Sequence, residues 1–368
     1  MTSPSREATS IVTLVPLFSA CLFHPHYITS VRSPTAIDVA YNSLYMQAEI
    51  CEDQQLWDET IHELGGHPLQ LWGWGEVKAA HGWTAYRLLV THDTEVRGAT
   101  QVLVKVLPWP FRRFVYIPRG PVCTDSDQDE ILDTVATYAK QHLPGAVLSV
   151  EPPRELAPAG EGWQKSSNTI LIPNTLILDL TKSEEELQVA MAKKTRQYIR
   201  KSGQEALTIR RVKQREMLAD CLGIYHETAE RAGFPLHDDQ YYYDVFDRLG
   251  DSSVIFAASD EHGPVAFLWL AVSAGTAFEL YGGMNEQGQQ LRANYALKWH
   301  AISECKKWGV KEYDLNGLLN DKISTFKRGF ASHETELAGT YDYPLSPLYF
   351  IWAKLLPAAK KLTRRLKR

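Results

Sequence analysis

The order of the expected secondary-structure elements repeats within this chain. Residues 56–152 and residues 240–317 each read as a helix, a hairpin of two strands, a third strand, a second helix and a closing strand. The residues barely match between the two copies, but the elements do. The repeat predicts a mixed α/β protein built from two copies of one module, a sheet with helices across it. A cleft between two such halves is a common place for a ligand.

The segments outside and between the repeats set the expected domain boundaries. Residues 1–45 differ from the rest, because an arginine followed by an apolar run over residues 11–23 resembles a short signal-peptide core. We favour the alternative that translation starts at Met46, with the preceding residues a disordered tail or an artefact of the assigned start. The expected units are the extension 1–45, a first domain at 46–162 that is completed by 337–368, and a second domain at 163–336.

Charge and cysteine usage exclude several functions. The formal net charge of the 368 residues is −5, so any contact with nucleic acid has to come from a local basic patch. The five cysteines are scattered without CxxC spacing, which favours reduced thiols, a cytoplasmic protein and no structural zinc. The sequence has no nucleophile elbow and no cluster of metal ligands, and we therefore expect neither a metal nor a cofactor.

A basic helix is expected between the two copies. Ser183 and Glu186 form a capping-box pattern, and the helix that they open continues to Gly203. Its cations have no acidic residue among them, whereas solvated helix faces usually mix signs. We therefore expect a phosphate or nucleic-acid contact here, with a solvated face as the plain alternative. The cations are Lys193, Lys194, Arg196, Arg200 and Lys201.

A lysine interrupts an apolar stripe near residue 327. Ile323, Phe326, Lys327 and Phe330 are spaced so that a helix would place them on one face. An ammonium on such a face is costly to bury unless it meets an anion, a carbonyl or a cleft. From spacing alone, a lysine that snorkels at the edge of the stripe is the simpler interpretation.

The end of the chain is basic and aromatic. Residues 346–368 contain seven Lys and Arg and no acidic residue, and the apolar run Leu348–Trp352 precedes the cations. This pattern is typical of a helix that lies on an anionic membrane surface. The alternative is a C-terminal helix packed on the first domain with a basic end.

Several motifs, in this order and spacing, resemble those of the Fem family (FemABX type). They are WGWGEVK, YIPRGPV, KKTRQYIRKSG, LYGGM, the helix at 299–302 that leads to YDLNG, and FKRGF. The resemblance covers about residues 50 to 345. The chain is similar to the shorter members of the family, because no long heptad segment follows Lys201. It implies two tandem GNAT-like domains. It also implies transfer of an amino acid from aminoacyl-tRNA to the stem peptide of a UDP-linked or lipid-linked peptidoglycan precursor, which builds the interpeptide bridge.

The same resemblance implies site residues. The Phe-Lys pair that lies at the family's reaction centre matches Phe326 and Lys327. From its position at the end of the expected strand, Asp314 either orients Lys327 or the incoming amine, or caps the next helix. A histidine stands where similar members carry an arginine in the precursor site, which weakens the expectation of a permanent charge there. The residues that match the precursor site are Lys78, His237, Tyr241 and Tyr281, with Tyr242 or Tyr243 as alternatives to Tyr241.

Two rival functions make different demands on the sequence. An acetyl-CoA-dependent N-acyltransferase needs a glycine-rich pyrophosphate loop, and residues 287–292 do not fit that pattern. A non-catalytic precursor-binding protein would keep the cleft but would not need Lys327. We expect a monomeric cytoplasmic enzyme that touches the inner face of the membrane from the periphery.

Overall fold

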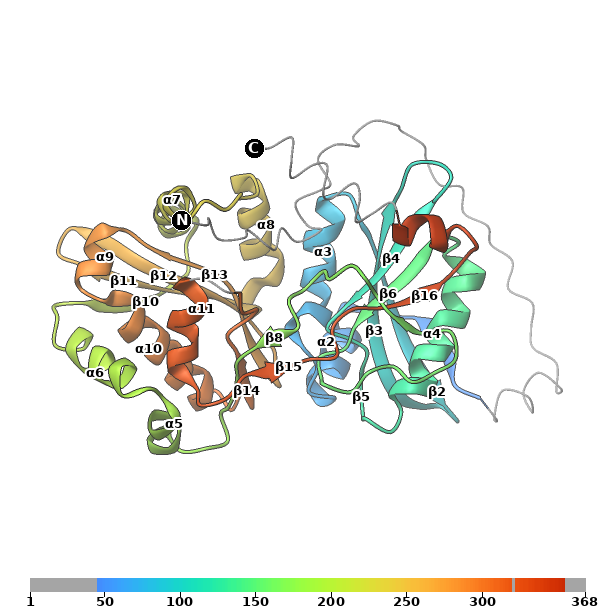
Figure 1. The fold of residues 1–368 in the computed structure, drawn as a ribbon, viewed down its shortest axis with the longest axis horizontal. Coiled ribbons are helices and arrows are strands. Elements are labelled where there is room, and N and C mark those ends of the chain that lie inside the picture. The colour runs from blue at the N-terminus through green and yellow to red at the C-terminus, as the bar shows by residue number, and fades with distance from the viewer. Residues whose placement is uncertain (1–44, 320–321, 355–368) are drawn as a thin grey trace, which may run out of the picture.

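Two mixed sheets follow one another along the chain in the computed structural model, which describes residues 45–319 and 322–354 (Figure 1). The first sheet has the order β1-β2-β3-β4-β6-β16-β7, with β5 paired to β3, and only its β4–β6 pair is parallel. Its strands are β1 (Gln47–Ile50), β2 (Thr84–His92), β3 (Glu95–Val106), β4 (Arg113–Pro118), β5 (Val122–Cys123), β6 (Val147–Glu151), β7 (Gln164–Lys165) and β16 (Tyr341–Pro344).

Helices cover both faces of the first sheet. The apolar face of α4 (Gln128–His142), which includes Ile131 and Val135, packs on Val102 and Val115 of the sheet. On the other side lie α2 (Gln54–Glu63), the short helix η3 (Pro68–Gln70) and α3 (Trp72–Ala80).

The second sheet has the order β10-β11-β12-β13-β14-β9, and its β13–β14 pair is parallel. Alternate side chains of β12 enter two different cores, as a strand with both faces covered requires. Leu268 and Leu270 pack towards one core, whereas Phe267 and Trp269 pack towards the other. The strands are β9 (Ile177–Asp179), β10 (Thr208–Val212), β11 (Ser253–Asp260), β12 (Gly263–Val272), β13 (Thr276–Met284) and β14 (Glu312–Asp314).

The helices of the second half sort onto the same two faces. One core is closed mainly by α10, and the other by α7 and α8. The helix α3 of the first half joins the second of these cores through Trp74 and Val77, and this shared core is where the halves meet. The helices are α5 (Glu184–Ala190), α6 (Lys193–Ser202), α7 (Arg215–Ala232), α8 (Asp239–Leu249), α9 (Glu286–Gln290), α10 (Ala293–Lys307) and α11 (Lys322–Lys327).

The mixed α/β class and the tandem arrangement of two sheets are confirmed. One expected element differs, because the single helix over 183–203 is two helices, α5 and α6. The capping box of Ser183 and Glu186 is present, but Met191 and Ala192 have extended ψ angles of 152° and 142° and interrupt the helix.

The chain crosses between the two halves more than once. A two-stranded ladder of β8 (Asn174–Thr175) and β15 (Thr335–Glu336) lies where the chain passes between the halves. The expected extension 1–45, apart from Tyr45, and the basic end over 355–368 lie outside the described residues. Within the described ranges, none of the helices has both the length and the apolar character that crossing a membrane requires.

Candidate active site

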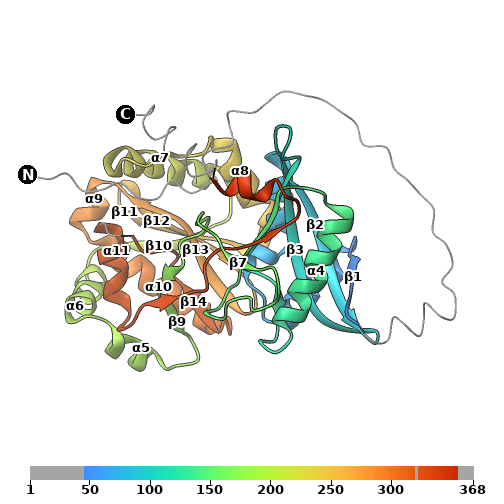
Figure 2. The ribbon, with the colours of Figure 1, turned by 45° about the vertical axis from the view of Figure 1, so that its right-hand side comes forward.

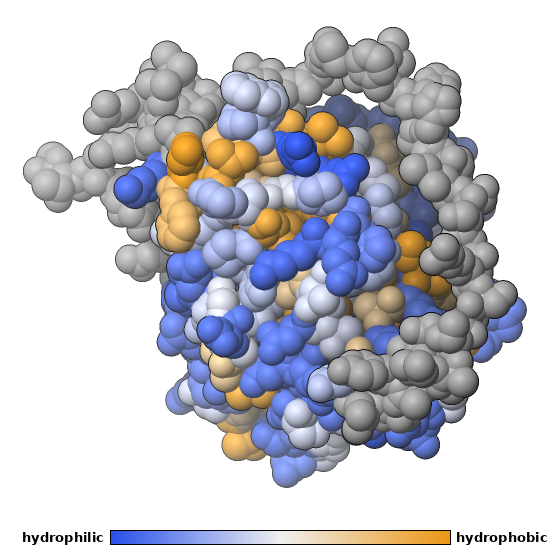
Figure 3. All heavy atoms as spheres, turned by 90° about the vertical axis from the view of Figure 1, so that its right-hand side faces the viewer, coloured by the Kyte–Doolittle hydropathy of each residue, from blue (hydrophilic) through white to orange (hydrophobic). Residues whose placement is uncertain are grey.

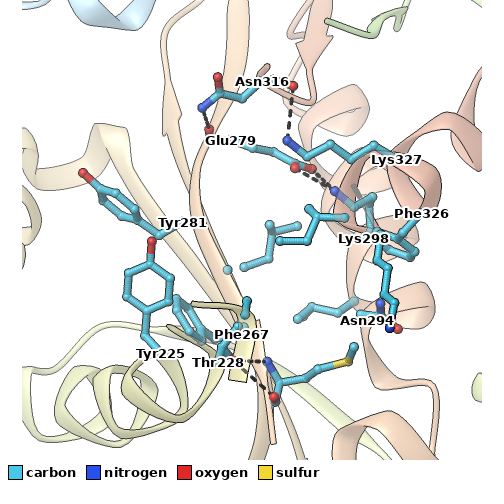
Figure 4. A pocket seen from close by; sticks show the side chains of 18 of the residues that line it. Tyr225, Thr228, Phe267, Glu279, Tyr281, Asn294, Lys298, Asn316, Phe326 and Lys327 are labelled. Atoms are coloured by element: carbon cyan, nitrogen blue, oxygen red, sulfur yellow. Dashed lines mark hydrogen bonds and ion pairs between the residues drawn. The ribbon is translucent and has the colours of Figure 1, made fainter. Parts of the chain in front are cut away.

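A pocket of about 550 Å³ opens in the second half, between β13 on one side and α10 and α11 on the other (Figure 4). Its wall combines aromatic side chains with a few polar groups, which is the usual character of a small-molecule site. The residues that line it include Tyr225, Glu279, Tyr281, Lys298, Asn316, Phe326 and Lys327.

Lys327 and Phe326 both line this pocket. The Lys327 ammonium donates to the backbone carbonyls of Asn316 and Gly317, each at 3.2 Å. The Phe326 ring meets Tyr295 edge to face with 4.9 Å between ring centroids, which fixes the ring beside the lysine. The ammonium on this apolar stripe therefore meets carbonyl groups at a pocket wall, which offsets the cost of removing it from water. All residues that line the pocket belong to the second half, and so Lys327 does not face the space between the halves.

The loop that holds Lys327 is itself held by side chains. Asn316 has a φ of 61°, a left-handed conformation that asparagine tolerates better than most residues. Its side-chain amide donates to the Glu279 carbonyl at 2.9 Å, and its backbone N–H donates to Asp314 Oδ1 at 2.7 Å. These bonds point the Asn316 carbonyl towards the lysine, as Figure 4 shows.

Asp314 does not line the pocket of Lys327. Its buried carboxylate accepts hydrogen bonds from the Thr175 hydroxyl and the Asn316 backbone, and burial raises the pKa of this carboxyl. The geometry therefore makes Asp314 a residue that positions the Asn316 loop, and so acts on Lys327 through that loop.

A buried ion pair beside Lys327 was not expected from the sequence. Lys298 of α10 donates to Glu279 of β13 at 2.7 Å, with only 5% and 7% of the two side chains exposed. Tyr313 donates to the same carboxylate at 2.9 Å. The Lys298 ammonium also lies 5.3 Å from the centroid of the Phe326 ring, so the pair supports the aromatic wall of the pocket.

The four expected precursor-site residues lie together where the halves meet. Lys78 of α3 donates to the Tyr241 hydroxyl of α8 at 2.8 Å, and His237 stacks on the Tyr241 ring with 4.0 Å between centroids. Burial and the neighbouring Tyr241 raise the pKa of Tyr281, which also lines the pocket of Lys327. The four residues thus form a chain of side-chain contacts that begins at the junction of the halves and ends with Tyr281 at the pocket wall.

His237 is expected to be neutral at physiological pH. Burial and the Lys78 ammonium lower its pKa to about 4, against about 6.5 for an unperturbed histidine. In the unfolded chain this histidine takes up a proton near pH 6.5, whereas in the folded protein it does so only near pH 4. The free energy of unfolding is therefore unaffected above pH 6.5 and decreases as the pH falls towards 4. An NMR titration of the ring, assigned with His237→Gln, should show a midpoint near pH 4, and a midpoint at or above 6.5 would instead indicate a cationic clamp.

The cations of α6 divide into two groups. Arg196 donates to the carbonyls of Gln188, Val189 and Met191, and so satisfies the end of α5. The others are exposed, and α6 packs on α10 through Tyr198 and Tyr295, whose ring centroids lie 5.0 Å apart. Tyr295 in turn contacts Phe326, so the basic surface lies behind one wall of the pocket. The exposed cations are Lys193, Lys194, Arg200 and Lys201.

A second pocket, of about 600 Å³, lies between the halves and is lined by Arg119, His67 and Asp314 among others. Arg119 belongs to the motif YIPRGPV and is almost fully buried with a φ of 48°. The Coulombic influence of Arg119 lowers the pKa of Asp314 against the larger effect of burial. The first half therefore acts electrostatically on the residue that positions the Lys327 loop.

Comparison with known proteins identifies the family. A sequence model of the FemAB family matches residues 160–261 and 256–358, which together are more than half of the chain. The chain therefore belongs to the FemAB family. It is 23% identical over 402 aligned residues to the lipid II:glycine glycyltransferase of Staphylococcus aureus (strain USA300), with 82% of this chain and 95% of that protein covered.

Solved structures share this fold. The crystal structure of FemX is similar with a TM-score of 0.72 at 19% identity, and the match covers 83% of this chain and all of that one. The structure of L-PGS from Bacillus licheniformis is similar with a TM-score of 0.52 at 13% identity, covering 83% of this chain and 96% of that one. The likeness to FemX confirms the tandem fold that the family resemblance implies.

Proposed function

We propose that this protein is an aminoacyltransferase that moves an amino acid from aminoacyl-tRNA to the stem-peptide amine of a peptidoglycan precursor. The observation that carries the proposal is the Lys327 ammonium, held by two carbonyls at the wall of an aromatic pocket. Membership of the FemAB family and similarity to a glycyltransferase named for lipid II support a transferase and this class of acceptor.

The chemistry requires a charge-stabilising group where Lys327 lies. The neutral acceptor amine attacks the ester carbonyl carbon, and negative charge develops on the carbonyl oxygen of the tetrahedral intermediate. The carbon–oxygen bond to the ribose then breaks, an amide forms, and the proton lost by the amine ends on the ribose hydroxyl. A fixed ammonium in a site poor in water stabilises the oxyanion or the departing ribose oxygen. In this proposal Lys327 is that group and Phe326 shapes the pocket around the aminoacyl group.

The two substrates are assigned to two different surfaces. The precursor would bind at Lys78, His237, Tyr241 and Tyr281, because these side chains contact one another from the junction of the halves to the wall of the reaction pocket. The exposed cations of α6 would receive tRNA phosphates, because this surface lies behind the wall of the same pocket. The Nη1 group of Arg196 already donates to carbonyls at the end of α5, so we expect the other four cations to carry most of this role.

A reconstituted assay tests the proposal. The purified protein is incubated with a panel of charged tRNAs and with either UDP-linked or lipid-linked muramyl pentapeptide, and the acceptor is analysed by mass spectrometry. We expect the acceptor to gain the mass of one amino acid with at least one of the charged tRNAs. Uncharged tRNA is the control. Transfer of an acetyl group from acetyl-CoA, with no transfer from any tRNA, would refute the proposal.

A further inference from the structure

The tip of the β3–β4 hairpin carries an exposed tryptophan. Trp109 is 91% exposed and Val106 is 75% exposed, although both are large apolar residues. The loop is closed by a hydrogen bond from the Leu107 N–H to the Arg112 carbonyl at 2.8 Å, so the tip has a defined shape. A side chain of this size gains nothing from folding when it is left in water, which makes the tip a candidate contact surface.

A second apolar surface adjoins this tip. The helical residues 349–354 pack beside the hairpin, where the rings of Phe111 and Trp352 lie 5.4 Å apart. Figures 1 and 2 both show the hairpin tip and this helix at the same, upper end of the first half. On the helix, Phe350 is 65% exposed and Ile351 is 50% exposed.

These four side chains form one apolar end, which we call the apolar tip: Val106, Trp109, Phe350 and Ile351. Among the described residues, twelve large apolar side chains are exposed, and these are four of them. Apolar atoms gather along the upper edge of the face that Figure 3 presents.

Beyond Glu95, the charged residues of the β3–β4 hairpin and of the helix at 349–354 are all cations. No acidic residue occurs between Glu95 and Asp125, and Arg112 in the hairpin and Lys354 in the helix are both exposed. The sequence that follows Lys354 adds six Lys and Arg and no acidic residue. Cations that flank exposed aromatic side chains complement a surface with anionic headgroups and an apolar interior.

We infer that the apolar tip docks this protein on an anionic lipid bilayer, with Trp109 at the headgroup level and Arg112 and Lys354 against the headgroups. Tryptophan favours this interface because its ring is large and apolar while its N–H can still bond to water. A stable protein–protein interface takes about 20–30 residues a side, which is far more than this tip offers. Docking through the hairpin goes beyond the reaction proposed above and does not depend on it.

Vesicle sedimentation tests the inference without any substrate. The full-length protein is mixed with vesicles of phosphatidylcholine alone or with added phosphatidylglycerol, and the bound fraction is measured. We expect about tenfold tighter binding to the anionic vesicles, and a loss of about tenfold or more in the variant Trp109→Ala/Phe350→Ser. Trp308→Ala is the matched control, since Trp308 is also exposed but lies in the second half, and it should bind as the wild type does.

Other outcomes would overturn the inference. Equal binding of the double variant and the wild type would mean that a different surface makes the contact. Equal binding to neutral vesicles would remove the role of the cations. Light scattering on the protein without vesicles adds a further test, because a dimer that Trp109→Ala abolishes would make the tip a contact between two copies. Because no tRNA or precursor is present, failure here leaves the assay for aminoacyl transfer unaffected, and the reverse also holds.

Discussion

Replacing Lys327 with alanine is expected to lower the turnover number for aminoacyl transfer by about 10²–10³-fold, the loss typical of removing one donor to an oxyanion. The reason is that the ammonium at the wall of the pocket would no longer stabilise the charge that develops on the carbonyl or ribose oxygen. The effect should fall mainly on kcat, because the interaction strengthens only when that charge appears. Steady-state kinetics with a charged tRNA and the muramyl pentapeptide measures it.

Lys322 is the control for this experiment. It lies at the other end of α11 and lines the same pocket, but it is exposed and the catalytic assignment does not involve it. Lys322→Ala should change kcat by less than about threefold, as expected for a solvated charge. If Lys327→Ala transfers the amino acid as fast as Lys322→Ala does, Lys327 is not the stabilising cation, whatever the protein binds.

Replacing Lys298 with methionine is expected to destabilise the protein by about 3–5 kcal/mol, because the Glu279 carboxylate would stay buried without its counter-ion. The Tyr313 hydroxyl would still donate to that carboxylate, but it does not neutralise the charge. For a folded domain of this size, the midpoint temperature of thermal unfolding should decrease by about ten degrees. Differential scanning calorimetry measures the change.

The same helix offers a matched control. Lys307 of α10 pairs with Glu304 at 2.8 Å on the surface, with 65% of the lysine side chain exposed. Lys307→Met should cost no more than about 1 kcal/mol. The double variant Glu279→Gln/Lys298→Met should recover most of the loss, because it removes both charges and leaves an acceptor for Tyr313. Equal midpoints for Lys298→Met and Lys307→Met would show that the buried pair contributes little to stability.

The sequence located Lys327 but missed Lys298, although both are lysines on apolar faces of helices. Lys327 stood out because three of the four residues on its short stripe are apolar. In α10 the spacing of Leu297, Ala301, Cys305 and Trp308 predicts the apolar face, yet Trp308 is 44% exposed while Lys298 is buried. Its partner Glu279 lies on a strand, and only the packing of that helix on the sheet brings the two charges together. Helical periodicity cannot reveal a partner on another element.

The role of Asp314 also required the structure. From the sequence, orienting the lysine or the incoming amine and capping the next helix are equally good interpretations of Asp314. The structure shows a third arrangement, in which the carboxylate accepts from Asn316, and the carbonyl of Asn316 then accepts from Lys327. This depends on a left-handed φ at Asn316 and on Thr175 from a distant strand. Neither the backbone angle nor the distant partner can be predicted from local spacing.

The position of β16 has a consequence for how this chain is made. The strand comes from the end of the chain, yet it inserts between β6 and β7 of the first sheet. The whole second half must therefore be synthesised before the first sheet can be completed. Until then β6 is an open edge that can pair with another chain. Nascent chains that stop before Tyr341 should be recognised by chaperones as unfinished at their N-terminal half, even though almost all of that half has already been synthesised.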